Sequence, residues 1–287
     1  MATPQRGFGF NVQADYLVAL LRIALGAVFV IGGIKLAFLG ETAALVASYI
    51  DPATGWIAPV FEEKITHTLG LSVGVFLRSQ GGLEIILGAM LILGLGTRVV
   101  AIIIGLMFWS FTVANPVAGE IRLSRDIALM GLCYAVALSG AGAWSLDRSL
   151  WQRPFSFPAQ RDCVLLLVRL SLAYTLLASA AFAHGVFANP LNSTLPVVVV
   201  FLAGFLLAVG VRPHWIMALL VVWMLYILSA QMLAKGVYFG LDAAKRELGF
   251  LAAALMYGTL GPDRWIWPQA IPAALPTDQQ EHASSLS

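Results

Sequence analysis

The sequence has few charged residues and few cysteines, and the small number of charged residues excludes an ordinary soluble domain. Only 11% of its 287 residues are Asp, Glu, Lys or Arg, and two residues are cysteine. A soluble globular domain usually carries about 25% charged residues. Hydrophobic residues make up 60% of the chain, and the mean hydropathy is +0.86. The composition therefore excludes an ordinary soluble domain and predicts an all-α integral membrane protein that lies in a lipid bilayer.

The sequence also lacks the patterns typical of bound cofactors and of nucleic-acid binding. Cys133 and Cys163 lie on separate segments without a CxxC pair, and no Cys/His cluster has the spacing of metal ligands. There is no P-loop and no GxGxxG turn after a strand. The formal net charge is only +2, and the basic residues are scattered singly. We therefore expect no metal site, no bound haem or nucleotide and no nucleic-acid partner.

Eight apolar segments are long enough to be membrane-spanning helices. We expect these spans at about 16–39, 71–94, 99–114, 125–141, 163–187, 195–210, 214–233 and 245–258. The first run is long enough to span, so we interpret it as a retained helix and not as a signal peptide. Between the first two spans, the stretch ETAALVASYI (41–50) is predicted to form a short interfacial helix.

The second half of the sequence repeats the first. ILGLGTRVVAIIIGLMFWSF aligns with LLAVGVRPHWIMALLVVWML, and Arg125-Asp126 aligns with Arg246-Glu247. Four spans per unit is an even number, so the two units would be parallel repeats that enter the bilayer from the same side. We therefore predict a four-helix unit at 1–150, a cytoplasmic connector at 151–162, a degenerate second unit at 163–267 and a disordered cytoplasmic tail at 268–287.

The loop cations predict the orientation in the membrane. Seven arginines lie on the side that holds both termini: Arg6, Arg98, Arg148, Arg153, Arg161, Arg212 and Arg264. Fewer loop cations lie on the other side. By the positive-inside rule, both termini are cytoplasmic, and the protein is a multi-pass protein of the cell inner (cytoplasmic) membrane.

A carboxylate lies near the middle of the second predicted span. Glu84, Gln80 and Gly88 fall on one face of that helix at about 100° per residue, and Arg78 lies on the near flank of this face. A charge at bilayer depth is costly, so such a residue usually faces the interior of a helix bundle. Glu84 is therefore either the anchor of a structural ion pair or part of a ligand or proton site.

The internal repeat helps to choose where a site would lie. Glu84 aligns with Val198, Arg78 with Asn192, and Lys35 with Phe182. Residues needed only to build the bundle should be present in both units, so we expect the site in the first unit. Arg125-Asp126, by contrast, has an ionic counterpart in the second unit, which favours a structural role for that pair.

The candidate site residues are the charged and polar residues that we expect at similar depths in the bilayer. We predict Glu84 as the catalytic, proton-handling carboxylate. The candidate ligand-binding residues around it are Lys35, Arg78, Gln80, Arg125 and Asp126. An outward-opening pocket floored by Glu84 would accept a quinone, or a sulfur oxyanion held by Lys35 and Arg78.

Three stretches of the first half resemble the DoxX family of bacterial and archaeal membrane proteins. They are RIALGAVFVIGGIKL, GGLEIILGAMLILGLGTR and RDIALMGLCYAVALSGAGAWSLDR. The resemblance covers about residues 16–150; the second half matches loosely and lacks counterparts of Glu84 and of the SLD ending. The family's best-known member is the DoxD subunit of thiosulfate:quinone oxidoreductase. The resemblance implies a four-span unit, diffusible quinone as electron acceptor, and a partner redox subunit.

Three functions remain open from the sequence. The first is the membrane subunit of a quinone-linked oxidoreductase, which oxidises thiosulfate or another small sulfur species. The second is a small-solute transporter, which the repeat and the intramembrane charges also fit. The third is a non-catalytic membrane anchor or assembly subunit of a larger complex.

Overall fold

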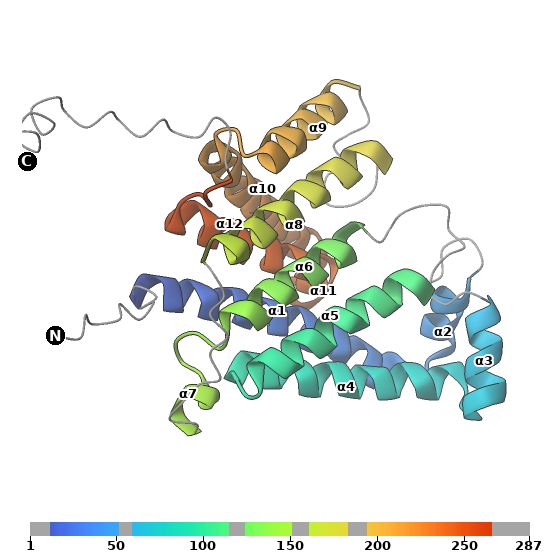
Figure 1. Cartoon of the computed structure of the whole chain (residues 1–287). Coiled ribbons are helices and arrows are strands. Elements are labelled where there is room, and N and C mark those ends of the chain that lie inside the picture. Colours follow the sequence, from blue (N-terminus) through green and yellow to red (C-terminus); the bar gives the residue numbers. More distant parts are fainter. Residues whose placement is uncertain (1–11, 52–58, 115–123, 151–160, 183–193, 266–287) are drawn as a thin grey trace, which may run out of the picture.

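The fold is entirely helical in the part of the chain that the structure describes. This computed structural model describes residues 12–51, 59–114, 124–150, 161–182 and 194–265, and in these ranges it contains twelve helices and no strand. In chain order the helices are α1 (Val12–Leu39), α2 (Ala43–Ile50), α3 (Pro59–Leu69), α4 (Val73–Leu93), α5 (Thr97–Ala114), α6 (Ser124–Ser139), α7 (Leu146–Leu150), α8 (Arg161–Phe182), α9 (Thr194–Val209), α10 (Pro213–Lys235), α11 (Val237–Ala243) and α12 (Lys245–Leu260). Their arrangement is shown in Figure 1.

Each of the eight predicted apolar segments coincides with a helix, although not every helix is long enough to count as a span. Four segments are long and apolar enough to cross a bilayer: 14–39, 73–93, 161–181 and 213–235, which belong to α1, α4, α8 and α10. The apolar parts of α5 and α9 are shorter, and α6 and α12 have 16 residues each and begin with charged residues. The all-α membrane class is thus confirmed with four candidate spans.

Three short helices were not predicted, and one was. The predicted interfacial helix at 41–50 is present as α2. Helix α3 lies inside the long connection after the first span, and α7 and α11 follow the fourth and seventh predicted segments. The break before α11 occurs at Gly236, whose φ of +78° is accessible to glycine at little cost. The connector residues 151–160 and the tail from 266 onward lie outside the described residues.

Helices α1 and α4 pack antiparallel through two rows of glycines spaced seven residues apart. One row is Gly26 and Gly33 on α1 with Gly40 directly after its end, and the other is Gly74, Gly81 and Gly88 on α4. A Cβ built on Gly26 would lie 2.7 Å from the carbonyl oxygen of Gly88, and a Cβ on Gly88 would lie 2.7 Å from that of Gly26. Small residues let the backbones of membrane helices approach closely. This contact holds the α4 residues around Glu84 directly against α1.

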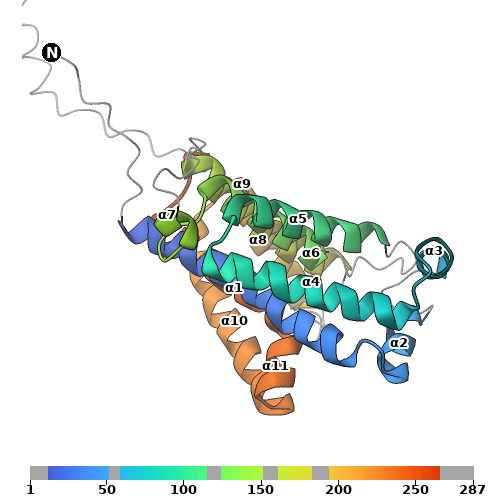
Figure 2. The ribbon, with the colours of Figure 1, turned by 90° about the horizontal axis from the view of Figure 1, so that it is seen from below.

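The two halves of the chain share one hydrophobic core. Helix α6 packs against α5 and α8, and α1 packs against both α4 and α12. The largest cluster of buried apolar side chains includes residues from α1, α5 and α6 as well as from α8, α10 and α12. Figure 2 shows α10 and α11 projecting from the same body to which α1 and α4 belong. Because no boundary separates their cores, the predicted units at 1–150 and 163–267 stay a prediction.

Arg22 on α1 and Arg169 on α8 are almost completely buried. Each forms hydrogen bonds with the segment that follows the last long helix of its half, which is α6 in the first half and α12 in the second. Arg22 donates from Nη2 to the carbonyl oxygens of Ala143 at 3.3 Å and Trp144 at 3.0 Å. Arg169 donates from Nη2 to the carbonyl oxygen of Trp265 at 2.9 Å and from Nε to Asp263 Oδ2 at 2.9 Å. Buried charges need such partners to offset the loss of water.

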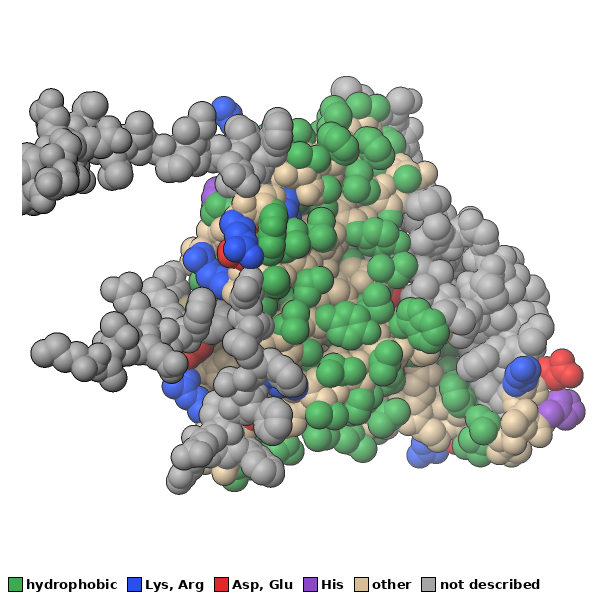
Figure 3. Space-filling view, viewed as in Figure 1, with side chains coloured by type: hydrophobic (Ala, Val, Ile, Leu, Met, Phe, Trp, Pro, Cys, Tyr) green, Lys and Arg blue, Asp and Glu red, His purple; other side chains and the backbone are tan. Residues whose placement is uncertain are grey.

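The molecular surface carries a wide apolar area. In Figure 3, hydrophobic side chains cover the middle of the face shown, and charged side chains lie toward its ends. Large exposed apolar residues occur on α5, α9 and α10, among them Ile102, Leu106, Trp109, Phe201, Phe205, Leu219 and Val222. Such extensive apolar exposure is typical of helices that face lipid.

Candidate functional site

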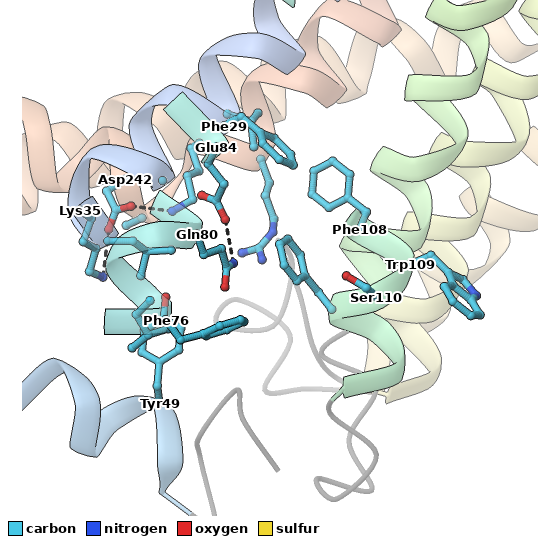
Figure 4. A pocket seen from close by; sticks show the side chains of 18 residues that line it. Phe29, Lys35, Tyr49, Phe76, Gln80, Glu84, Phe108, Trp109, Ser110 and Asp242 are labelled. Carbon is cyan, nitrogen blue, oxygen red and sulfur yellow. Dashed lines mark hydrogen bonds and ion pairs between the residues drawn. The ribbon is translucent and has the colours of Figure 1, made fainter. Parts of the chain in front are cut away.

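A cavity of about 580 Å³ lies between α1, α4 and α5, closed on other sides by α2 and by the turn from α11 to α12. Its lining residues are Val28, Phe29, Gly32, Lys35 and Leu36 of α1, Tyr49 of α2, Phe76, Leu77, Gln80 and Glu84 of α4, Phe108, Trp109, Ser110 and Phe111 of α5, and Asp242, Ala243, Lys245 and Arg246 at the turn. The volume falls in the range of small-molecule sites. Figure 4 shows this cavity with the predicted residue Glu84 on its wall.

Glu84 has polar partners on two sides. Its side chain is buried on α4, and Gln80, one turn earlier, donates from Nε2 to Glu84 Oε1 at 2.9 Å. A Cβ built on Gly32 would lie 3.4 Å from Glu84 Oε2 and 3.3 Å from Lys245 Nζ. The absence of a side chain at Gly32 therefore leaves the space in which the ammonium of Lys245 approaches the carboxylate of Glu84.

An acid from α11 joins two lysines at the same wall. Asp242 accepts a hydrogen bond from Lys245 Nζ at 2.6 Å and another from Lys35 Nζ at 3.2 Å. Burial alone would raise the pKa of Asp242, but the ammonium groups of Lys245 and Lys35 hold that pKa below its usual value. Asp242 is therefore ionised at neutral pH, and it fixes the two lysines at the edge of the cavity.

Behind this wall, two crossed ion pairs join α6 to α12. Arg125 Nη1 lies 3.3 Å from Glu247 Oε1, and Arg246 Nε lies 2.8 Å from Asp126 Oδ1. Both acids are buried. Each helix thus supplies one cation and one acid to the other, and Arg246 also lines the cavity. Through Arg246, the contact between α6 and α12 therefore adjoins the cavity.

Aromatic rings form the remaining walls. Phe29 and Phe108 meet edge to face with their centroids 5.1 Å apart, and Figure 4 shows both beside the cavity, with Phe76 and Tyr49 at another side. Burial, followed by the negative charges of Glu84 and Asp242, raises the pKa of Tyr49 to about 12. The Tyr49 hydroxyl therefore stays protonated at neutral pH.

The structure brings together some of the predicted residues and not others. Glu84, Gln80 and Lys35 line the cavity, whereas Arg125 and Asp126 lie in the adjoining ion pairs and do not line it. The expected position of Arg78 is wrong. Its side chain is exposed and forms an ion pair with Glu41 at 3.2 Å. Six residues on a helix correspond to about 600°, so Arg78 points roughly 120° away from Glu84.

Five polar residues of the cavity were not assigned to it from the sequence. They come from α2, α5, α11 and α12, and no local motif marks them: Tyr49, Ser110, Asp242, Lys245 and Arg246. The only available signal was the alignment of Arg246-Glu247 with Arg125-Asp126, which indicated a shared role without showing that the two pairs meet. The second half therefore contributes side chains to the cavity directly, in addition to the first unit, where we expected the site.

Neither a metal site nor a nucleophile elbow is found among the described residues. Within the described ranges, no three His, Cys, Asp or Glu side chains are grouped so that they could hold a metal ion. We also expected the sequence to contain no GxSxG motif, and this expectation is wrong, because GLSVG at 70–74 matches the pattern. Ser72 there caps the start of α4 by accepting a hydrogen bond from the Val75 amide. The match therefore reflects a helix cap, since a nucleophile elbow would follow a strand.

Comparison with known protein families, with curated proteins and with solved structures gives no match for this chain. The resemblance to the DoxX family therefore stays a prediction that rests on the residues quoted for it.

Proposed function

We propose that the chain is the membrane subunit of a quinone-linked oxidoreductase, related to the DoxX family, and that the cavity beside Glu84 binds the quinone ring. The observation that carries the proposal is a buried carboxylate on the wall of a small-molecule cavity with aromatic walls. Flat aromatic rings pack favourably against such side chains. A carboxylate within reach of a quinone oxygen can exchange a proton with it, as general acid–base chemistry requires.

The balance of charges supports an uncharged ligand. Four cations lie in and around the cavity, namely Lys35, Arg125, Lys245 and Arg246, and four acids accompany them, namely Glu84, Asp126, Asp242 and Glu247. An anion held there would have to displace one of these acids from its cation. A sulfur oxyanion is therefore not favoured in this cavity, and oxidation of thiosulfate or a similar species would fall to a partner subunit.

Reduction of a quinone to a quinol takes two electrons and two protons. In this proposal the electrons come from a partner redox subunit, Glu84 transfers one proton to a quinone oxygen, and solvent water supplies the proton for the other oxygen. Lys245, next to Glu84 and anchored on Asp242, stabilises the carboxylate that remains. Gln80 and Asp242 hold these two groups in position.

We also propose that the helices form eight spans in two parallel units, with both termini on the cytoplasmic side of the inner membrane. Corresponding contacts support this arrangement. Helix α8 packs on α9 as α1 packs on α4, α10 packs on α12 as α5 packs on α6, and α12 meets α1 as α6 meets α8. The excess of loop arginines on the side of the termini supports the proposed orientation.

Quinone binding in lipid nanodiscs tests the proposed function. We expect Glu84→Gln to weaken binding about two- to tenfold, because the protonated carboxyl that donates to the quinone oxygen is replaced by a weaker amide donor, and a neutral hydrogen bond contributes about 0.5–1.5 kcal/mol. Glu41→Gln is the matched control, since Glu41 is an exposed acid near the same end of the bundle. Failure of the wild type to bind quinone, or equal binding by Glu84→Gln, would refute the proposal. Uptake of a solute into liposomes without a redox partner would then favour the transporter.

A further inference from the structure

The cavity has one polar wall and one apolar wall, and they lie on opposite sides. Figure 4 shows Glu84, Lys35 and Asp242 together on one side, while Phe108 lies across the cavity on α5. The charged groups come from α1, α4 and the α11–α12 turn, and α5 contributes only Phe108, Trp109, Ser110 and Phe111. A cavity with this division fits a ligand that has a polar head and an apolar extension.

The apolar side of the cavity reaches residues on the outside of the bundle. Ser110 lines the cavity and is itself exposed. Figure 4 shows Ser110 on the inner side of α5 and its neighbour Trp109 pointing away from the cavity. Trp109 is 54% exposed, and it continues the exposed apolar face formed by Ile102 and Leu106 on the same helix. The cavity therefore extends to a helix surface that has the character of a lipid-facing surface.

Among the described residues, the packing of the neighbouring helices places no further helix between α4 and α5 on this side. Helix α4 packs along α1, whereas α5 packs along α6. From the turn at Gly94–Gly96, α5 diverges from α4 in Figure 1, and the side chains of Phe76 and Phe108 border the space that results.

Resting on the proposed function, we infer that the ligand is a lipid-soluble quinone whose isoprenoid tail passes between α4 and α5, beside Ser110, into the bilayer. A cavity of about 580 Å³ holds a quinone ring and the first part of a tail but not a long isoprenoid chain. The tail has to leave by a route without charges. Helix α5 contributes four lining residues and none of them is charged, whereas α1, α4 and the α11–α12 turn each contribute a charged residue.

Binding of the quinone tail and binding of the quinone ring should therefore depend on different residues. A bulky side chain at Ser110 would narrow the exit while leaving the wall around Glu84 unchanged. Ser110→Trp is the test variant. Leu106→Trp is the matched control, because Leu106 lies one turn earlier on the same exposed face and does not line the cavity. Each variant is first checked for the elution volume and thermal unfolding of the wild type.

The experiment compares two quinones in lipid nanodiscs that contain the full chain. One is a dimethoxy-methyl-benzoquinone without a tail, and the other carries a ten-carbon tail on the same ring. For each quinone, the ratio of the variant's Kd to the wild-type Kd cancels partitioning into the lipid. We expect Ser110→Trp to raise the Kd of the tailed quinone at least tenfold and that of the tailless quinone less than twofold, with both unchanged in Leu106→Trp.

The outcomes separate this inference from the function on which it rests. If Ser110→Trp changes neither Kd, or changes both equally, the tail does not pass beside Ser110, although Glu84→Gln would still weaken binding. An equal loss in Leu106→Trp would attribute the effect to the lipid-facing surface and would also overturn the inference. If the wild type binds neither quinone, both the inference and the proposed function are wrong.

Discussion

Gly33 on α1 and Gly81 on α4 face each other so closely that a Cβ on either would lie 2.7 Å from the carbonyl oxygen of the other. The contact belongs to the two heptad-spaced glycine rows of these helices. A Cβ on Gly33 would also lie 2.9 Å from the Cβ of Glu84. The position of the candidate proton-handling carboxylate therefore depends on a helix contact that only glycines permit.

Alanine at position 81 should separate these two helices. Because its Cβ would meet backbone atoms of α1, we expect Gly81→Ala to lower the free energy of unfolding by about 1–3 kcal/mol, the usual cost of overpacking. Gly82→Ala is the control, since a Cβ there meets nothing within 4 Å, and alanine favours a helix by about 0.5–1 kcal/mol. Denaturant titration in detergent micelles measures both, and a similar loss in the two variants would contradict the close contact.

The buried pair of Arg169 and Asp263 should be important for stability. Asp263 accepts from Arg169 Nε at 2.9 Å and from the Tyr257 hydroxyl at 3.0 Å. Removing one member of a buried pair leaves an uncompensated charge, so Asp263→Asn should cost about 3–5 kcal/mol. Asp162→Asn removes a pair with Arg264 that is partly exposed and 3.6 Å long, and it should cost less than about 1 kcal/mol. The two variants differ in thermal unfolding if the burial of Asp263 is as described.

Reversing the charge of Arg125 on α6 should destabilise the protein unless the charge of its partner Glu247 on α12 is reversed as well. Arg125→Glu places an acid beside the buried Glu247, and we expect it to reduce the yield of folded protein and its unfolding temperature. Adding Glu247→Arg restores the opposite charges, and at least half of the lost stability should return. Double-mutant analysis of unfolding gives the coupling between the two positions, and additive effects would show that the pair does not form.

Asp242 should make stability depend on acid pH in a defined direction. Its pKa is lowered in the folded protein, so the unfolded chain binds a proton more readily. The stabilisation is complete above the unfolded pKa of about 3.9, and it is lost as the pH falls through the lower folded value. Unfolding curves between pH 3 and pH 7 should therefore show a steeper loss below about pH 4 in the wild type than in Asp242→Asn. Parallel curves would mean that the Lys35–Asp242–Lys245 contacts do not form.

The sequence predicted most helices because apolar length alone marks them. Hydropathy placed α1, α4, α8 and α10 correctly, and the cost of a charge in lipid singled out Glu84 before any geometry was known. Hydropathy does not distinguish a short apolar helix that spans a membrane from one that does not, so the eight predicted spans remain more than the four that length and composition support.

The parts of the site that sequence could not predict come from contacts between distant segments. Arg78 was assigned to the site because it is close to Glu84 in sequence, although the helical rotation turns it outward to Glu41. Lys245 and Asp242 reach the cavity wall beside Glu84 through the packing of α1 on α12 and on α11, respectively, and no spacing within a helix encodes that approach. Local periodicity gives the direction of a side chain, whereas its partner depends on which helices meet.

The crossed ion pairs of Arg125 with Glu247 and Asp126 with Arg246 have an evolutionary consequence if the halves arose by duplication. A single four-helix unit with a cation and an acid at these adjacent positions would bind a second copy of itself through the same two pairs. The ancestral protein would then have been a symmetric homodimer with two equivalent cavities. Fusion of the two genes would have removed the need for both copies to stay alike, so that one kept its carboxylate at position 84 while the other carries Val198.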